Sequence, residues 1–247
     1  LDGGVGPDSM NGGDGSDTYF VGEAGDIVVE SSAAAAGGID TVVSSVGYLL
    51  GANLENLRLL AGNISGSGNA LDNLLFAGAG NNTLDGGAGV DTVSYLYSSS
   101  GVGVGLGIAG GQWTGGSGFD SLLNIEILIG SAFNDALTGT AAGDNIKGGA
   151  GSDTIDGGPG ADVLDGEGGA DSLIGGAASD NYYVDEPGDV AVETDANAAV
   201  GGIDTAYTSV DIAALWANVE NVRILGTVQL DVRGNNLNNV IYAGAGN

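Results

Sequence analysis

The sequence predicts an all-β chain built as a solenoid of short stacked strands, and three observations support this prediction. Between Gly130 and Tyr183 the chain reads as six consecutive nine-residue words, each with aspartate in sixth place and an apolar residue in eighth place. The first section of the chain is repeated after Tyr183, so a longer unit occurs twice. The apolar runs lack the 3.6-residue spacing that indicates a helix. Repetition at a short fixed period is typical of one solenoid rather than of separate globular domains.

The six words keep their register throughout. In order they read GSAFNDALT, GTAAGDNIK, GGAGSDTID, GGPGADVLD, GEGGADSLI and GGAASDNYY. The sixth places hold Asp135, Asp144, Asp153, Asp162, Asp171 and Asp180, and the eighth places hold Leu137, Ile146, Ile155, Leu164, Leu173 and Tyr182. A flexible glycine-rich linker would have no reason to keep these two columns two residues apart over six copies.

The word resembles the repeat-in-toxin (RTX) nonapeptide, GGxGxDxUx, in which U is a large apolar residue. The resemblance implies a right-handed parallel β-roll, in which each word supplies a glycine-rich turn and a three-residue strand and two words complete one coil. It also implies calcium ions in the turns. The residues agree with this interpretation, because glycine permits the positive φ angles of tight turns and exposes backbone carbonyls. Carbonyl and carboxylate oxygens are the hard donors that suit Ca²⁺.

Aspartates eighteen residues apart should lie on the same edge of such a roll, where two of them could share one ion. With Asp189 included, the central words give five pairs: Asp135 with Asp153, Asp144 with Asp162, Asp153 with Asp171, Asp162 with Asp180, and Asp171 with Asp189. Asp8 with Asp26 is a sixth candidate, and Asp17 is a candidate to join neighbours across the adjacent coil. The turn carbonyls expected to complete these sites belong to Gly149, Gly151, Gly158, Gly160 and Gly169.

The composition narrows the classes of partner and of chemistry. The 247 residues include 4 Lys and Arg and 32 Asp and Glu, for a net charge of −28, which argues against nucleic acid and anionic membranes as partners. Histidine and cysteine are both absent, which removes disulfides, the usual zinc sites and the Ser-His-Asp and Cys-His catalytic arrangements. We therefore expect no enzymatic activity in these residues, and calcium in place of disulfides as the stabilising link. No apolar run reaches transmembrane length, so membrane insertion is not expected.

Four sections are predicted within one continuous solenoid. Residues 1–67 begin with nonapeptide words and continue as wider coils, with strands expected at 27–29, 41–43, 48–50 and 57–60. Residues 68–129 hold degenerate words and a strand or hairpin insertion, residues 130–192 hold the central words, and residues 193–247 repeat the wider coils of 27–81. Roughly thirteen coils at about 4.8 Å each would make a rod on the order of 60 Å long. The two ends of the chain match neighbouring parts of the repeated unit, which favours a segment of a longer array.

The degenerate section should bind calcium less well than the central words. Its sixth places hold Asn73, Asn82 and Asp91, and a further word adds Asp120. Asparagine keeps the turn but gives up a charge, so ions should be weak or missing at the first two positions, with Asp91 the best ligand of the first three. In the inserted segment we expect Trp113 to cover an edge of the core.

A second recurring motif is Asn-x-Glu, which occurs at Asn53, Asn124 and Asn218. A catalytic carboxylate is one interpretation of its glutamates, Glu55, Glu126 and Glu220. The motif lies between apolar strands, however, where a turn-capping or side-chain ladder role suffices. We therefore favour the structural role.

Two classes of function remain open. One is a calcium-dependent structural segment of a secreted or cell-surface bacterial protein, such as an adhesin, a surface-layer protein or a filament-like protein. Its expected partners are calcium ions, neighbouring copies, other surface proteins or polysaccharide. The alternative is the non-catalytic repeat region of a secreted enzyme of the protease, lipase or alginate epimerase type. The resemblance also implies type I secretion, which suits a chain that stays unfolded at low calcium and folds when calcium binds.

Overall fold

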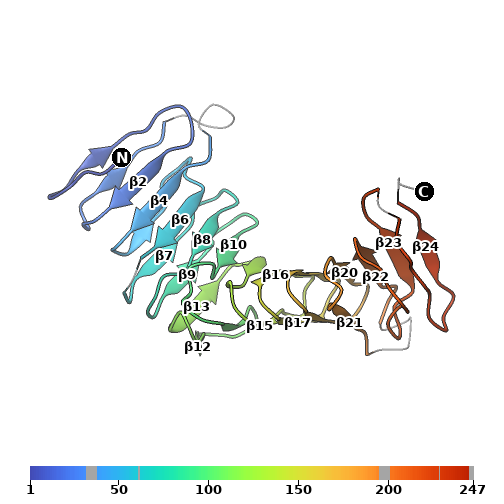
Figure 1. The fold of residues 1–247 in the computed structure, drawn as a ribbon. Coiled ribbons are helices and arrows are strands. Elements are labelled where there is room, and N and C mark those ends of the chain that lie inside the picture. Colours follow the sequence, from blue (N-terminus) through green and yellow to red (C-terminus); the bar gives the residue numbers. More distant parts are fainter. Residues whose placement is uncertain (32–37, 61, 195–200, 228, 245–247) are drawn as a thin grey trace. The chain divides into compact units, whose positions relative to one another are not determined.

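The computed structural model describes residues 1–31, 38–60, 62–194, 201–227 and 229–244. In these residues the regular secondary structure consists of strands and contains no helix (Figure 1), and the strands pair in parallel in all but one case. The prediction of an all-β parallel solenoid is confirmed. Because there is no helix in the described part, there is also none that could span a membrane. Parts of the last predicted section, residues 195–200, 228 and 245–247, lie outside the described residues.

The chain forms two units, each described here by itself. The first unit comprises Leu1–Val102 and Ile108–Ile129, and the second comprises Gly103–Gly107 and Gly130–Asn247. The continuity of the solenoid through both units stays a prediction.

The first unit has two faces of parallel strands. One face runs in the order β2 (Thr18–Val21), β4 (Thr41–Ser44), β6 (Asn56–Leu59), β8 (Leu74–Phe76), β10 (Thr92–Ser94) and β14 (Ile127–Ile129). The other runs in the order β5 (Tyr48–Leu49), β7 (Ser65–Ser67), β9 (Thr83–Asp85) and β13 (Phe119–Leu123), with β12 (Gly111–Trp113) antiparallel to β13. A separate pair joins β1 (Ser9–Met10) and β3 (Ile27–Val28). The strands expected in the wider coils are therefore present, within one or two residues of their predicted bounds.

The second unit repeats this arrangement. One face runs in the order β16 (Asn145–Ala150), β18 (Val163–Gly168), β20 (Asn181–Val184), β22 (Thr205–Thr208), β23 (Asn221–Ile224) and β24 (Val240–Tyr242). The other runs in the order β11 (Gly103–Gly105), β15 (Ala136–Thr138), β17 (Thr154–Pro159), β19 (Ser172–Ala177) and β21 (Val190–Val192). Ile146 pairs with Leu164, and Ile155 pairs with Leu173. Partners are thus eighteen residues apart, and two words complete one coil as predicted.

The eighth-place side chains form the core of the second unit. All six are at most 1% exposed, while the residues beside them in β16 to β19 are partly or fully exposed. Alternation of this kind follows from the two-residue period of a strand, which points every second side chain inward.

The strands of the central words are longer than predicted. Each of β16 to β19 has six residues rather than three, because the strand continues through the first glycines of the next word. Gly148 shows why glycine is needed there: a Cβ atom at this position would lie 2.3 Å from Oδ2 of Asp153. The strand can pass the carboxylate only where there is no side chain.

The inserted segment consists of two separate strands, and the expectation for Trp113 was wrong. Its first strand, β11, pairs with β15, whereas β12 forms a hairpin with β13. In that hairpin Gln112 lies opposite Asp120 and is 7% exposed, while Trp113 lies opposite Phe119 and is 71% exposed. The alternation of the strand places the amide inward and the indole in solvent.

Replacing Ile155 with alanine should destabilise the calcium-loaded protein by about 2 to 5 kcal/mol, because it leaves a cavity among fully buried side chains. Urea unfolding at saturating calcium measures this change. Thr154→Ala is the matched control, since Thr154 is an exposed neighbour on the same strand. Equal losses in the two variants would contradict the assignment of the core.

Candidate metal sites

From Asp153 to Asp180, each sixth-place aspartate accepts a hydrogen bond from a backbone N–H of the coil before it. The N–H of Asp135 donates to Oδ1 of Asp153 at 2.8 Å, and that of Asp153 donates to Oδ1 of Asp171 at 2.7 Å. The same bond joins Asp144 to Asp162, Asp162 to Asp180, Asp171 to Asp189, and Asp8 to Asp26, at 2.7 to 3.2 Å. The six pairs expected from the sequence are therefore neighbours in the structure.

The second carboxylate oxygen of several of these residues is buried without a partner. In the central words the residues that share this feature are Asp153, Asp162, Asp171 and Asp180, each at most 2% exposed. In the first unit it recurs at Asp8, Asp17, Asp40 and Asp91. A buried charged oxygen without a hydrogen bond is costly, so each of these atoms calls for a cation or a proton.

A backbone carbonyl lies close to one of these oxygens: a Cβ atom at Gly148 would lie 2.3 Å from Oδ2 of Asp153 and 2.8 Å from the carbonyl oxygen of Gly166. The turn glycines Gly149, Gly151, Gly158, Gly160 and Gly169 all adopt positive φ, between 89° and 150°. The carbonyls of Gly151 and Gly158 face the next coil on the same edge: a Cβ atom at Gly176 would lie 2.2 Å from the oxygen of Gly158. Carboxylate and backbone carbonyl oxygens, in a space that side chains leave open, fit Ca²⁺.

Burial also changes the protonation of these carboxyls. It raises the pKa of Asp153, Asp162 and Asp171 to about 6, despite the backbone hydrogen bond that opposes the shift. It raises the pKa of Asp180 to about 7. A proton and a cation therefore compete for these oxygens close to neutral pH.

A family model, the RTX calcium-binding nonapeptide repeat (4 copies), matches residues 1–28, 67–95, 129–164, 156–186 and 232–247, which together exceed half of the chain. The chain belongs to this RTX family. The predicted family is thereby confirmed, and calcium is the ion that these repeats bind. No curated protein matches the chain.

Not every RTX word of the chain leaves an oxygen open. In the first two central words serine and threonine replace the second glycine, and their own groups bond the carboxylate. Thr140 donates both its N–H and its hydroxyl to Oδ2 of Asp144, at 2.6 and 2.9 Å. Ser131 donates its N–H and its hydroxyl to Asp135, at 2.5 and 2.7 Å. These two aspartates are weaker calcium candidates than the four that follow.

The carboxylates of three further calcium candidates also accept hydrogen bonds from other residues of the chain. Oδ2 of Asp26 accepts the N–H groups of Gly22 and Glu23, at 3.0 and 3.1 Å. Oδ2 of Asp189 accepts those of Asp185 and Glu186, at 3.1 and 2.9 Å. Asp120 accepts the N–H of Asn82 and the hydroxyl of Thr114. Calcium binding at these three residues stays a prediction with less support.

Asparagine in sixth place hydrogen-bonds the backbone of the preceding coil through its side-chain amide, without an ion. The Nδ2 atom of Asn73 donates to the carbonyls of Leu54 and Glu55 in the preceding coil, at 3.1 Å each. Asn82 bonds Gly62 and Ile64 in the same way, and Asn239 bonds Val219 and Glu220. The amide hydrogens thus bond carbonyls that could otherwise face a cation, and weak or missing ions at Asn73 and Asn82 stay a prediction that these bonds support.

Four acidic residues of the wider coils were not among the predicted ligands: Glu30, Asp40, Glu193 and Asp204. Carboxylate oxygens of Asp17, Glu30 and Asp40 lie within 4.8 Å of one another, and so do those of Asp180, Glu193 and Asp204. The eighteen-residue spacing used to pair the aspartates does not predict these clusters, because the wider coil separates Asp17 from its neighbour Asp40 by more than two nine-residue words. The internal duplication was the signal that could have found them, since all three acids recur.

The Asn-x-Glu motif has the ladder role that was predicted. Oε2 of Glu55 accepts the N–H of Asp40 at 2.9 Å, and Oε2 of Glu220 accepts that of Asp204 at 3.0 Å. Glu126 bonds Asp91 in the same way at 2.8 Å. Glutamate here replaces the aspartate of the regular RTX word as the acceptor.

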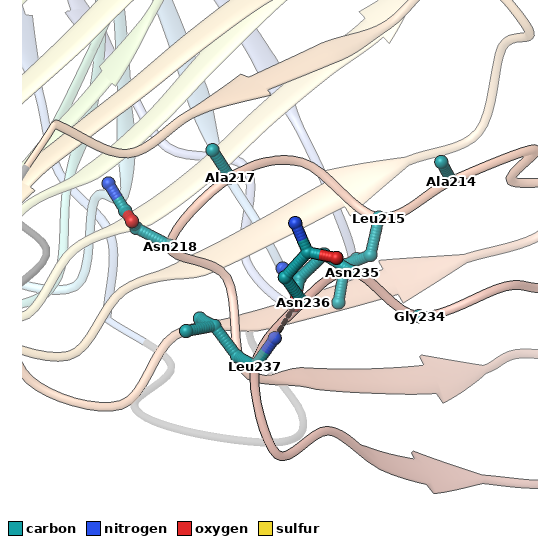
Figure 2. Close-up of a pocket in the computed structure, with 8 residues that line it drawn as sticks. All are labelled: Ala214, Leu215, Ala217, Asn218, Gly234, Asn235, Asn236 and Leu237. Carbon is teal, nitrogen blue, oxygen red and sulfur yellow. Dashed lines mark hydrogen bonds between the residues drawn. The ribbon is translucent and has the colours of Figure 1, made fainter.

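A pocket of the second unit offers no catalytic group. Figure 2 shows its lining, which consists of Ala214, Leu215, Ala217, Asn218, Gly234, Asn235, Asn236 and Leu237. The Nδ2 atom of Asn235 bonds the carbonyls of Trp216 and Val219, at 2.7 and 2.8 Å. The lining has no acid, base or nucleophile, and Asn235 has a structural role.

Replacing Asp162 with asparagine should convert a calcium-dependent coil into one whose buried polar groups are hydrogen-bonded without an ion. The new amide can donate to backbone carbonyls as that of Asn73 does. We expect fewer bound calcium ions by equilibrium dialysis, with the β signal retained at saturating calcium. Asp156→Asn removes the same charge from a strand position of the preceding word and should keep the number of ions. An unchanged number in Asp162→Asn would contradict the assignment.

Calcium affinity should fall as the pH is lowered from about 7.5 to 5.5, because the raised pKa values of Asp153 to Asp180 let protons compete with the ion. In the absence of calcium the effect of pH on the folded protein is the opposite: a lower pH should stabilise it. The folded protein binds more protons than the unfolded chain between about pH 4 and 7, so its stability should decrease as the pH rises through this window. Calorimetric titration with calcium, and thermal unfolding in chelator, at several pH values measure the two effects. A calcium affinity that does not change with pH would contradict the first.

Proposed function

We propose that this chain is a calcium-dependent structural segment of a secreted or cell-surface protein, and that it folds when it meets extracellular calcium. The observation that supports this most directly is the run of four consecutive words with a buried, unpartnered carboxylate oxygen. These oxygens are stacked one coil apart on the edges of the roll, in a chain of net charge −28. Without a cation, their burial and mutual repulsion oppose the folded state.

Calcium binding would then drive folding. The four sites are formed from residues of successive coils, so they exist only when the coils are stacked. Binding free energy is therefore folding free energy. Extracellular calcium modules are tuned to about 10⁻⁴ to 10⁻³ M, far above cytosolic calcium. The chain would stay unfolded inside the cell, which suits type I secretion, and would fold outside.

The internal duplication favours a structural array over the repeat region of a secreted enzyme. Tyr19 and Tyr182, Asp40 and Asp204, and Glu55 and Glu220 occupy equivalent places in the two units. Repetition of a whole unit, with its wider coils, lengthens a surface-exposed element and adds no catalytic group. An adhesin, surface-layer or filament-like protein is the class that uses such an element.

Calcium titration followed by far-UV circular dichroism tests the proposal. We expect a cooperative gain of β signal near millimolar calcium, and a loss of this transition when Asp153 and Asp162 are both replaced by alanine. Replacement of Asp135 and Asp144 by alanine is the comparison, because their carboxylates are already bonded by Ser131 and Thr140. A wild-type chain equally folded in excess chelator would show that calcium does not build this fold.

A further inference from the structure

We propose that the chain carries a second kind of calcium site, built from three carboxylates and present once in each unit. The residues are Asp17, Glu30 and Asp40 in the first unit, and Asp180, Glu193 and Asp204 in the second. Four of these six lie outside the segments matched by the RTX model, which end at residues 28 and 186 before the wider coils. The proposal goes beyond the function above, because it adds Glu30, Asp40, Glu193 and Asp204 as ligands and assigns Asp180, the last of the four central aspartates, to the second cluster.

The first supporting observation is the closeness and burial of the carboxylates. Within each cluster one oxygen of every residue lies within 4.8 Å of the others. Asp40, Asp180 and Asp204 are each 1% exposed, Glu30 is 5% exposed and Glu193 is 6% exposed. Asp17 is partly exposed, but the other two carboxylates of its cluster and all three of the second cluster are buried, so the carboxylates repel one another strongly. A divalent cation would offset both the burial and the repulsion.

The second observation is that the clusters contain unpartnered oxygens. The N–H of Asp17 donates to Oδ1 of Asp40 at 2.7 Å, and the N–H of Asp180 donates to Oδ1 of Asp204 at 2.8 Å. These bonds fix the stacking of the coils but use only one oxygen of each acceptor. The Oδ2 atoms of Asp17, Asp40 and Asp180 are buried and have no partner. If the acids only capped the backbone, these atoms would not need to be buried.

The third observation is that a tyrosine and an asparagine hold each glutamate in place, at equivalent positions of the two units. The hydroxyl of Tyr19 donates to Oε2 of Glu30 at 2.8 Å, and that of Tyr182 donates to Oε2 of Glu193 at 3.0 Å. Both tyrosines are fully buried.

The backbone beside each glutamate is fixed as well. Asn53 donates its Nδ2 to the carbonyl of Glu30 at 3.1 Å, and Asn218 does the same to Glu193 at 3.0 Å. Both asparagines adopt left-handed φ, 63° and 64°. The glutamate is thus directed toward the two aspartates rather than toward solvent.

The donor set identifies the class of ion. All three side chains offer oxygen, with no nitrogen or sulfur donor, which favours a hard cation such as Ca²⁺. A nonapeptide turn combines carboxylates with neutral carbonyls, whereas each of these clusters combines three carboxylates. Affinity of calcium sites rises with the number of charged ligands. The clusters should therefore fill at lower calcium than the nonapeptide turns.

The test uses the whole 247-residue chain with Glu30→Gln and Glu193→Gln combined. Calorimetric titration with calcium alone should show that this variant binds two fewer ions at the tightest sites. The number and affinity of the weaker sites should not change. Glu55→Gln with Glu220→Gln is the matched control. It makes the same charge change on the neighbouring coils, at glutamates that bond the backbone of Asp40 and Asp204. An unchanged number and affinity of tight ions in the Glu30 and Glu193 variant would overturn the proposal.

Two further measurements keep the test decisive if the double variant does not fold. Glu30→Gln alone should lose one tight ion and retain the one at Glu193. A crystal of the wild-type chain grown with calcium should show an ion about 2.3 to 2.6 Å from oxygens of Asp40 and Glu30, and its absence there would overturn the proposal. The outcome is also separate from that of the proposed function. A chain that stays folded in chelator but loses two tight ions in the variant would contradict calcium-driven folding and support these sites.

Discussion

The hydrogen bond between an acidic side chain and the backbone N–H of the preceding coil is the constraint on which the rest of the structure depends. It runs beside the backbone ladder from Asp135 through Asp153 and Asp171 to Asp189, and it fixes the register of each coil on the one before. The bond uses one oxygen of a carboxylate and carries the other into the interior. Every coil that uses aspartate in this way must therefore satisfy a second buried oxygen.

The chain satisfies that oxygen in several ways, and the choice determines which coils depend on calcium. Thr140 uses a hydroxyl, Asp189 accepts the backbone N–H groups of its own turn, and Asn73 removes the oxygen altogether in favour of an amide. The second oxygens of Asp153, Asp162, Asp171 and Asp180 have none of these partners. Calcium dependence is thus a local property of individual coils, and the central words concentrate it. Coils with asparagine can remain ordered on their own contacts.

The sequence predicted the fold and the paired aspartates wherever the coil length is constant, because a period of eighteen residues converts spacing directly into contact. It failed where the length changes. Asp40 lies beside Asp17 across a wider coil, so counting words could not place it, and the strand of Trp113 reverses direction in a hairpin whose pairing with Phe119 decides which side chains face outward. The sequence also did not predict that the carboxylate of Asp144 is hydrogen-bonded, because this depends on the orientation of a threonine hydroxyl in the turn.

The wider coil also explains why a third carboxylate is needed where it occurs. A calcium ion takes six to eight oxygen ligands, and a nonapeptide turn supplies several of them as glycine carbonyls. Asp40 and Asp204 follow Asp17 and Asp180 by 23 and 24 residues, so these two positions fall outside the nine-residue register. Glu30 and Glu193, each held by a buried tyrosine, bring a charged oxygen to these positions. Because a carboxylate attracts the ion more strongly than a carbonyl does, fewer ligands can hold it, and the ion also neutralises the stacked acids.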